Sequence, residues 1–323
     1  MLLSDSDDYQ HTTVLLQSAV EQLNIIPDGI YIDATLGRGG HTRAILERLG
    51  PHGRLIAIDK DPSAIAVVQQ HLHDDTRLEI IHGSFTAIAS LVAERGLTGK
   101  INGVLMDLGI SSPQVDNPAR GFSFMQEGPL DMRMDSTQGI TAAQWLAHVK
   151  EQELADVLWT YGDERFSRRI ARTICEQRET KPLTTTLELA ELVKRIYPRP
   201  KPSYSRKRVK QIHPATRTFQ AIRIMINQEL DDLSIALQQA LDALTIQGRL
   251  VVISFHSLED RIVKRFMRDK ARGESFPSDL PILDCDLGRQ VQRIGGIITP
   301  SDEEIQENPR ARSAVMRVAE KIA

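Results

Sequence analysis

The order of the apolar segments is the feature that most limits the fold of this chain. Short runs rich in β-branched residues are predicted to be strands, and they occupy Ile30–Ala34, Arg54–Ile58, Leu78–His82, Ile101–Asp107, Arg249–Ser254 and Ala314–Ala319. Between the early runs lie segments with helical spacing, at Gly40–Leu49, Pro62–Leu72 and Phe85–Arg95. Strands that alternate with helices predict an α/β fold, with a parallel sheet covered by helices on both faces.

A long interval separates the fourth and fifth predicted strands. About 110 residues of mostly helical pattern follow Asp107, before the amphipathic segment Asn227–Leu244 leads back to the sheet. We therefore predict an inserted helical domain at residues 116–213, with the main domain formed by 1–115 and 214–323. A length of 323 residues suits two domains.

The composition is that of a globular protein. Apolar residues make up 41% of the chain and charged residues 26%, and no apolar run is long enough for a membrane span. The acidic beginning MLLSDSDDYQ does not resemble a signal peptide, so a cytoplasmic protein without a membrane partner is expected. Cys175 and Cys285 stand 110 positions apart, which predicts neither a disulfide nor a metal site.

Positive charge is concentrated in one segment, although the net charge is -3. Nine bases and no acid occur between Lys194 and Arg217, and the densest group is a candidate for phosphate contacts: Arg206, Lys207, Arg208 and Lys210. A second group has the spacing of one helical face, for which a solvated surface is an adequate explanation: Arg261, Lys264, Arg265 and Arg268.

Glycines follow the first predicted strand, in the segment IDATLGRGGH. Asp33 is followed by Gly37, Gly39 and Gly40, a turn that lets the backbone approach a ligand closely. The third glycine of the dinucleotide fingerprint is missing, and so is the Lys-Ser/Thr ending of a phosphate loop. An acid followed by glycines suits the amino-acid part of S-adenosylmethionine (AdoMet), whose ammonium favours a carboxylate and whose carboxylate favours backbone N–H groups.

Two further loops complete the predicted cofactor site. Asp59 ends the second strand, 19 residues after Gly40, where a carboxylate can accept hydrogen bonds from ribose hydroxyls. Phe85 follows the third strand and is a candidate adenine contact, although a core position is an equal alternative. Asp33 and Asp59 can also be helix caps, and His41 can be a cap or a packing residue.

The fourth strand leads into DLGISSPQ, where the chemistry is expected. Methyl transfer from a sulfonium needs alignment and electrostatics rather than a metal ion. Asp107 and Gln114 can accept N–H bonds from an amine attached to a base ring, and Asp107 can take the proton. Methylation at carbon-5 of cytosine would need a thiolate, and neither cysteine lies in a strand-end loop.

Eight segments together resemble the bacterial RsmH (MraW) family, which methylates the exocyclic amine of a cytidine in 16S ribosomal RNA. They are HTTVLL, GRGGH, DLGISSPQ, RGFSF, GPLDMRMD, HPATRTFQAIRI, SFHSLEDRIVKRF and NPRARSAVMRVAE, and they span nearly the whole chain. The resemblance implies a class I (Rossmann-like) AdoMet-dependent methyltransferase with a helical insert. It also implies AdoMet contacts at Gly39, Gly40, His41, Asp59, Phe85, Asp107 and Gln114.

Two features depart from the pattern of known relatives. The basic stretch Tyr197–Gln211 is longer than the family pattern, so RNA contacts there are inferred from charge alone. The Asp/Asn/Ser-Pro-Pro-Tyr/Phe signature of amino-methyltransferases is replaced by DLGISSPQ.

An extruded cytidine needs a surface on which to stack. Phe122, Phe124 and Trp145 are candidates, with core packing as the alternative for each, and His256 after the fifth strand is a second catalytic candidate beside Asp107. The predicted function is AdoMet-dependent methylation of a cytidine amine in 16S rRNA of the small ribosomal subunit, by a monomer or homodimer. An NAD-dependent dehydrogenase and an assembly factor with a vestigial cofactor pocket remain alternatives.

Overall fold

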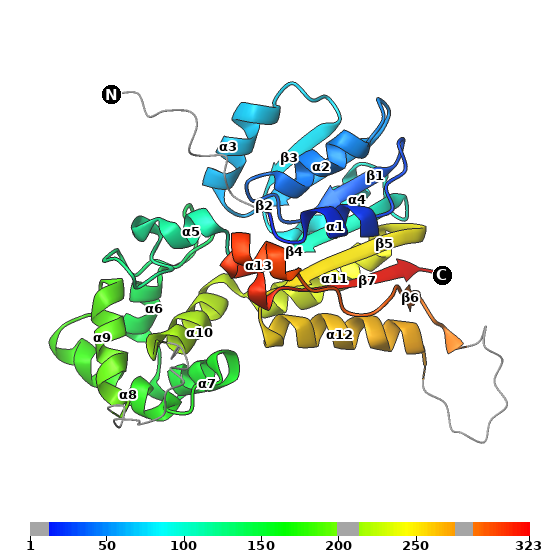
Figure 1. Ribbon diagram of the computed structural model, residues 1–323. Helices are drawn as coiled ribbons and strands as arrows, with labels where there is room; N and C mark the ends of the chain where they lie inside the picture. The colour runs from blue at the N-terminus through cyan, green and yellow to red at the C-terminus, as the bar shows by residue number, and fades with distance from the viewer. Residues whose placement is uncertain (1–12, 199–212, 275–286) are drawn as a thin grey trace, which may run out of the picture. The chain divides into compact units, whose positions relative to one another are not determined.

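The computed structural model describes residues 13–198, 213–274 and 287–323. The chain divides into two compact units, which are coloured along the sequence in Figure 1. The sheet unit comprises Met1–Gly109 and Leu230–Ala323, and the helical unit comprises Ile110–Glu229. Each unit has its own hydrophobic core.

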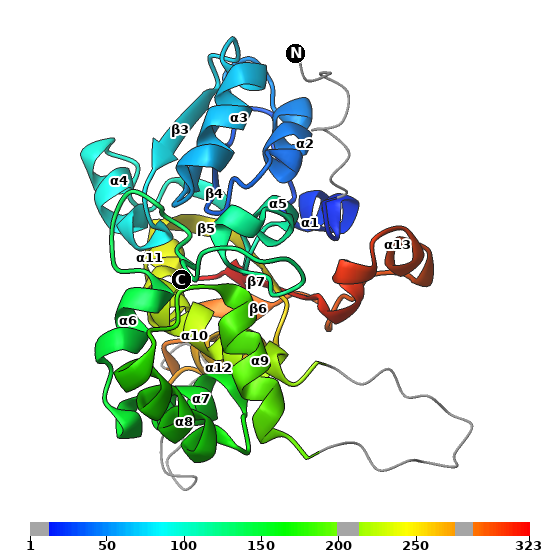
Figure 2. The ribbon, with the colours of Figure 1, turned by 90° about the vertical axis from the view of Figure 1, so that its left-hand side faces the viewer.

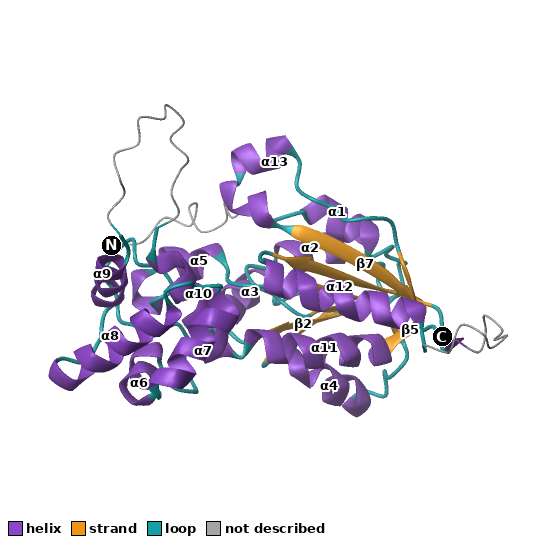
Figure 3. Ribbon diagram, turned by 90° about the horizontal axis from the view of Figure 1, so that it is seen from below, coloured by secondary structure: helices purple, strands orange, loops and turns teal. Residues whose placement is uncertain are grey.

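A seven-stranded sheet forms the centre of the sheet unit (Figure 3). Its order is β3 (Leu78–His82), β2 (Arg54–Asp59), β1 (Ile30–Asp33), β4 (Ile101–Asp107), β5 (Leu244–Ser254), β7 (Val315–Lys321) and β6 (Val291–Arg293). The first five strands in this order are parallel, whereas β7 is antiparallel to both β5 and β6. The sheet is therefore mixed, not wholly parallel as the alternation of elements predicts.

Alternate residues of the strands are buried on opposite faces of this sheet. Ile32, Ile58 and Met106 face the core formed with α4 (Ile88–Glu94), α11 (Glu229–Ala243) and α12 (Ser257–Arg272). Tyr31 and Leu105 face the core formed with α1 (Leu16–Gln22) and α2 (Gly40–Arg48), which Figure 1 shows on the other side of the strands together with α3 (Pro62–Leu72). Successive residues of a strand point to opposite faces of the sheet, so a sheet that is buried on both faces requires apolar residues at every position of its strands.

The predicted strands and helices agree with the structure except near the end of the chain. β5 begins at Leu244, five residues before the predicted start, because α11 ends one residue earlier, at Ala243. The three-residue strand β6 was not predicted, since so short a run has no recognisable pattern. An antiparallel pair needs no crossover helix, so the final strands carry no alternation of elements that would reveal their direction.

The strand order reverses between β1 and β4. From β1 the chain moves outward through β2 and β3, and then returns to place β4 on the other side of β1. Ligands of open α/β sheets bind at the carboxyl ends of the strands beside such a switch point. The loops after Asp33 and Asp107 lie at this position, and both residues end their strands.

The helical unit packs five helices around one core (Figure 2). They are α6 (Ala142–His148), α7 (Glu151–Gly162), α8 (Ser167–Thr180), α9 (Thr186–Ile196) and α10 (Ala215–Asn227). The unit also contains the short helix α5 (Ser112–Asp116) and the loop that follows it.

The bounds of the helical unit differ from the predicted insert, 116–213. The helix α10 belongs to this unit, because Phe219 and Ile222 are buried in the same cluster as Trp145 and Leu158. The strongly amphipathic pattern of α10 indicates a buried face but cannot tell which core buries it. Within the described residues, no helix is long and apolar enough to cross a membrane.

Candidate functional site

Three aspartates end neighbouring parallel strands. Asp33 closes β1, Asp59 closes β2 and Asp107 closes β4, as the strand pattern predicts. Because β1 pairs with both β2 and β4, the three carboxylates lie along one edge of the sheet unit. The electrostatics of this edge depend on what each carboxylate contacts.

Asp33 is fully buried and holds the loop that follows it. Its Oδ1 accepts the backbone N–H of Thr35 at 3.1 Å, and its Oδ2 accepts the hydroxyl of Thr42 at 2.7 Å. Burial raises the pKa of Asp33 to about 6, although the two hydrogen bonds oppose this shift. Both oxygens are engaged inside the protein, which is the pattern of a residue that shapes the loop.

The glycines of the loop allow close packing behind it. Gly39 has φ +76°, and a Cβ there would lie 3.0 Å from Val68 of α3. A Cβ on Gly40 would lie 1.8 Å from Thr13 Oγ1, so any larger residue would displace this segment. Gly37, with φ +50°, donates its N–H to Asp59 Oδ2 at 2.7 Å. The first turn of α2 is thereby held close to the ends of β1 and β2.

A cavity of about 440 Å³ borders this loop. Gly39 and Gly40 line it, together with residues of α1, Arg43 of α2 and Glu304 of α13 (Asp302–Glu307). None of the three strand-end aspartates lines it. The cavity therefore borders the glycine loop without including the strand-end carboxylates.

Asp59, like Asp33, accepts one hydrogen bond on each of its carboxylate oxygens. Its oxygens accept the backbone N–H groups of Gly37 and Asp61, at 2.7 and 2.8 Å. Burial raises its pKa. Since each carboxylate oxygen has two lone pairs, acceptor capacity remains for ribose hydroxyls. Next to it, the Lys60 ammonium lies 5.5 Å from the centre of the Phe85 ring and forms an ion pair with Asp232 of α11.

Asp107 and His41 each contain a buried polar atom without a hydrogen-bond partner among the described residues, as do Thr218, His256 and Gln290. His41 Nδ1 lies 3.7 Å from Asp107 Oδ2, whereas Asp107 Oδ1 and His41 Nε2 are buried and accept or donate no hydrogen bond within that part of the chain. Burial, followed by the nearby charges of Asp33 and Glu259, raises the pKa of Asp107 well above its usual range. Burial lowers the pKa of His41 to about 4, and the Val14 backbone offsets part of that shift.

Thr35 fixes the position of Asp107 and was not identified from the sequence. The backbone N–H of Asp107 donates to Thr35 Oγ1 at 2.7 Å, while Ala34 N–H donates to the Leu105 carbonyl at 2.9 Å. The loop after β1 is therefore bonded directly to the end of β4. The spacing Asp-x-Thr is a turn pattern that could have indicated the contact with Asp33, but the bond across to β4 has no local signal.

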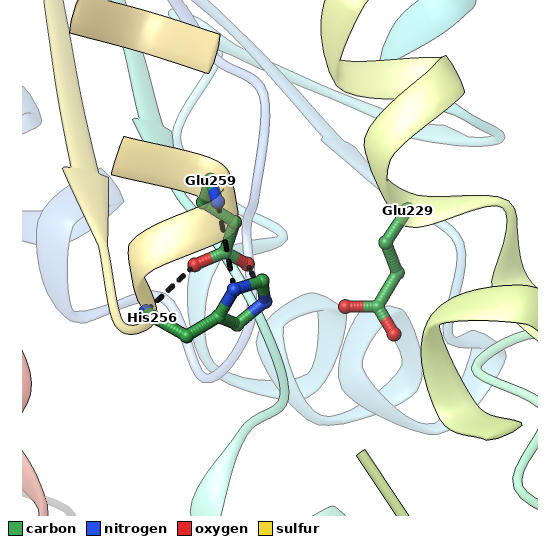
Figure 4. A group of neighbouring side chains, drawn as sticks. All are labelled: Glu229, His256 and Glu259. Atoms are coloured by element: carbon green, nitrogen blue, oxygen red, sulfur yellow. Dashed lines mark hydrogen bonds and ion pairs between the residues drawn. The ribbon is translucent and has the colours of Figure 1, made fainter. Parts of the chain in front are cut away.

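Glu259 is the second residue that sequence reasoning missed. It is 2% exposed, and its Oε2 accepts the N–H groups of Phe255 and His256 at 2.9 and 3.2 Å. His256 Nδ1 accepts the Glu259 N–H at 3.5 Å, and His256 Nε2 lies 3.1 Å from Glu259 Oε1 (Figure 4). This reciprocal pair caps α12, and a Glu three residues after a capping residue is a signal that could have found it.

The geometry assigns a tautomer to His256. Because Nδ1 accepts a backbone N–H, the ring proton belongs on Nε2, which faces Glu259 Oε1. Although Nε2 lies 3.1 Å from Glu259 Oε1, it is buried and forms no hydrogen bond within the described residues. His256 thus caps α12 through Nδ1 and keeps a second ring nitrogen without a hydrogen-bond partner in that part of the chain.

Three of the predicted RNA and cofactor residues in the helical unit have structural partners. Gln114 is buried, and its Oε1 accepts the Ser111 N–H at 2.9 Å in the capping box of α5. Phe122 and Trp145 are buried in the helical core, with 8% and 7% exposure, so they offer little ring surface to a base. The ring of Phe124 is only partly buried.

Phe124 contacts two other rings of the helical unit. Its centroid lies 4.6 Å from that of His213 and 4.8 Å from that of Phe219. The phosphate-contact candidates Arg206, Lys207, Arg208 and Lys210 fall between 199 and 212 and lie outside the described residues.

The segment GPLDMRMD is joined to α10 by one buried amide. Asn227 Oδ1 accepts the Met134 N–H at 2.7 Å, and Asn227 Nδ2 donates to the carbonyls of Met132 and Arg223 at 2.8 and 2.9 Å. In the same segment Asp131 pairs with Arg133 at 2.8 Å. These polar residues are satisfied by the protein itself.

The strand-end residues fit AdoMet. A buried acceptor without a partner, Asp107 Oδ1, and a surplus of carboxylates suit a ligand that carries ammonium and sulfonium charges. The glycine loop is hydrogen-bonded to Asp59 at the ends of β1 and β2, where the sequence predicts contacts with its amino-acid and ribose parts. The missing third glycine and the neighbouring Asp107 favour this ligand over a dinucleotide.

Comparison with known proteins agrees with this assignment. The profile of the MraW methylase family matches residues 8–322. An rRNA methylase from Streptococcus thermophilus is 12% identical, with 95% of this chain and 93% of that chain covered and a TM-score of 0.41. SMU.1697c from Streptococcus mutans, crystallised with SAH, is 13% identical, with coverage of 97% and 100% and a TM-score of 0.44.

A match over nearly the whole length, together with the sheet order 3-2-1-4-5-7-6 and the helical insert, settles the class I methyltransferase fold. The dehydrogenase alternative is therefore excluded. The chain belongs to the MraW methylase family, the AdoMet-dependent methyltransferases that modify the exocyclic amine of a cytidine in 16S ribosomal RNA.

Proposed function

We propose that Asp107 is the residue that receives the target amine and takes its proton. The observation that carries this proposal is the buried Oδ1 of Asp107, which has no partner among the described residues. Its backbone is fixed by Thr35, so the carboxylate is held in place before the substrate arrives. A raised pKa makes this carboxylate a stronger proton acceptor than an exposed aspartate.

The reaction needs few groups from the protein. AdoMet supplies an electrophilic methyl group on a sulfonium, so that an N–C bond forms as the S–C bond breaks and its electron pair stays on sulfur. Asp107 Oδ1 accepts an N–H of the cytidine amine, which increases electron density on the attacking nitrogen, and then receives the proton. His41 stays neutral because burial lowers its pKa to about 4, so it adds no positive charge beside Asp107.

The other predicted residues take supporting roles in this proposal. Asp59 binds the ribose hydroxyls, and Phe85 contacts the adenine with the ring face that Lys60 does not cover. Gly39, Gly40 and Gln114 remain proposed AdoMet contacts. Asp33 shapes the loop, and His256 positions α12 through Glu259.

On the RNA side, we propose that the helical unit recognises the substrate and that the 16S rRNA is presented within the small ribosomal subunit, in the cytoplasm. Phe124 is the aromatic candidate for stacking, because its ring is partly exposed and lies beside His213. The buried rings of Phe122 and Trp145 support the fold of this unit. The chain acts as a monomer or a homodimer, which sedimentation of the purified protein would distinguish.

Transfer of a labelled methyl group tests the assignment directly. Small subunits that lack the modification, and separately their naked 16S rRNA, are incubated with the protein and labelled AdoMet, and the nucleosides are then analysed. We expect label on the exocyclic amine of a cytidine, with subunits as the better substrate. Label on carbon-5 or on a ribose would refute the acceptor, and AdoMet binding without transfer would favour an assembly factor.

A further inference from the structure

The first two turns of α8 present three arginines on one exposed face, which continues to the exposed Glu176 and Glu179 nearer the end of the helix. Arg168, Arg169 and Arg172 are exposed, whereas Ile170, Ala171 and Ile174 are buried in the helical core. At 3.6 residues per turn the three arginines fall within an arc of about 100°, opposite the buried stripe. We call these residues, with Arg165 just before the helix, the α8 arginine face.

Neighbouring residues extend this face toward α9. The Arg165 guanidinium lies 4.7 Å from the centre of the Phe166 ring, which in turn packs edge-on against Tyr197 at 4.8 Å. Tyr197 is held by its hydrogen bond to the buried Glu164. Arg169 lines a hollow of about 580 Å³ between α8 and α9, and Arg195 of α9 lines the same hollow.

Few acids neutralise these arginines. Within the described residues, none of the ion pairs at 4.0 Å or less involves Arg165, Arg168, Arg169 or Arg195. Arg172 approaches Glu151 at 3.6 Å, but both side chains are about half exposed or more, which makes the pair weak. Two of the three acids that line the hollow are paired with lysines, Glu188 with Lys181 and Glu191 with Lys194, and the third is Glu127.

The position of the arginines does not serve the stability of the helix. Arg168 and Arg169 lie in the first turn of α8, which contains no acidic residue and has no side-chain cap. The positive end of the helix dipole makes cations unfavourable in that turn. A cluster that opposes local stability and has one weak carboxylate contact among the described residues, from Glu151 to Arg172, indicates an external anionic ligand.

We propose that the α8 arginine face binds the phosphate backbone of the RNA substrate. The proposal rests on the proposed function of the helical unit and names the surface that carries it. Guanidinium groups bind phosphate oxygens in a bidentate manner, and the rings of Phe166 and Tyr197 are packed against each other instead of facing a base. The face therefore contributes affinity and orientation, without reading the sequence.

The test compares two triple variants of the full-length protein. The first combines Arg165→Gln, Arg168→Gln and Arg169→Gln. The control combines Arg48→Gln, Arg54→Gln and Lys100→Gln, which removes the same charge from exposed positions at the amino-terminal edge of the sheet. Binding to a 16S rRNA transcript is measured over a salt series, with AdoMet affinity, methyl transfer and melting temperature measured on the same preparations.

We expect the first variant to bind RNA about tenfold or more weakly, with a salt slope lower by about 2, and the control to stay within about twofold. Its AdoMet affinity should be unchanged and its melting temperature equal or higher, because cations leave the first turn of α8. Equal RNA affinity of the two variants would overturn the proposal, as would a loss explained by a lower melting temperature. Failure of the wild-type protein to methylate RNA would instead count against the proposed function.

Discussion

The strand-end site and the GPLDMRMD segment both bury polar residues, but they differ in how those residues are satisfied. In the helical unit, both ends of the Asn227 amide are bonded to backbone groups of Met132, Met134 and Arg223. In the sheet unit, Asp107 Oδ1 and His41 Nε2 are buried without partners in the described part of the chain. The first pattern holds a fold together, and the second leaves atoms ready for a ligand.

This difference gives a criterion that motif matching does not. A buried polar group without a partner costs stability, so its retention points to a role outside folding. A satisfied group of the same type needs no such role. The following variants challenge this distinction, beginning with the largest expected effect.

Asp107→Asn should reduce methyl transfer by about two to four orders of magnitude, because the amide cannot accept the amine proton. The melting temperature should stay the same or rise, since a buried charge facing Asp33 and Glu259 is removed. Turnover and thermal melting are measured together. Asp28→Asn, an exposed acid in the turn before β1, is the control and should leave both unchanged.

His256→Ala sharpens the same experiment. Its turnover should fall much less than that of Asp107→Asn, while its melting temperature falls because α12 loses a cap. The reverse order of turnover would make His256 the proton acceptor and remove Asp107 from that role.

Asn227→Ala should lower the free energy of unfolding by roughly 3 kcal/mol, because the Met134 N–H and the Met132 carbonyl lose their partner. Denaturant unfolding measures the loss. AdoMet affinity, measured by calorimetry on the folded protein, should be unchanged, since the described contacts of Asn227 all lie in the helical unit. A selective loss of AdoMet binding with normal stability would contradict the view that the Asn227 amide serves the fold and not a ligand.

The pH dependence of stability should reveal the buried imidazole of His41. Its folded pKa of about 4 lies below the ordinary 6.5, so between these values the unfolded chain binds a proton that the folded chain does not. Stability therefore falls as the pH falls through this window, by roughly 3 kcal/mol in full. Asp33 has the opposite sign, because its pKa is raised to about 6 and its protonation favours the folded state.

Comparison with His41→Gln isolates this contribution, since Asp33 is present in both proteins. The difference in free energy of unfolding between variant and wild type should move in favour of the variant as the pH is lowered from 6.5 to 4. A pH-independent difference would mean that His41 is not held neutral by burial.

Asp59→Asn should give the smallest effect, an AdoMet affinity weaker by about tenfold, comparable to the loss of one charge-assisted hydrogen bond. Turnover at saturating AdoMet should change little, because Asp59 does not contact the reacting atoms in the proposed mechanism. Asp59 is an intermediate case in the comparison, since it is engaged by Gly37 and Asp61 yet keeps acceptor capacity. A large fall in turnover with unchanged AdoMet affinity would show that Asp59 acts in the methyl-transfer step and not in cofactor binding.

The parallel part of the fold could be predicted because each element has a local signal. The strands at Arg54–Asp59 and Leu78–His82 are short β-branched runs, and the helix between them has a proline at its first position and an Asp61 cap. The aspartates at the strand ends could be placed for the same reason. The antiparallel pairing of β7 depends on contacts between distant segments, which no local pattern encodes.

Within the site, the sequence indicates which residues lie at the strand ends but not which of them have partners. Asp33 and Asp107 stand at equivalent positions after β-branched strands, yet only Asp33 has both oxygens bonded, to Thr35 and Thr42. The same limit applies to Phe122 and Trp145, whose burial depends on how the helices pack.

The hydrogen bond from the Asp107 N–H to Thr35 Oγ1 joins the end of β4 to the glycine loop after β1. In the proposed reaction the loop holds the methyl donor, and Asp107 receives the amine. A shift of the glycine loop that improves the hold on the methyl donor also moves the carboxylate that receives the amine. Selection on this chain cannot tune the affinity for the donor and the reactivity toward the acceptor independently, and compensating changes should be found in pairs on β1 and β4.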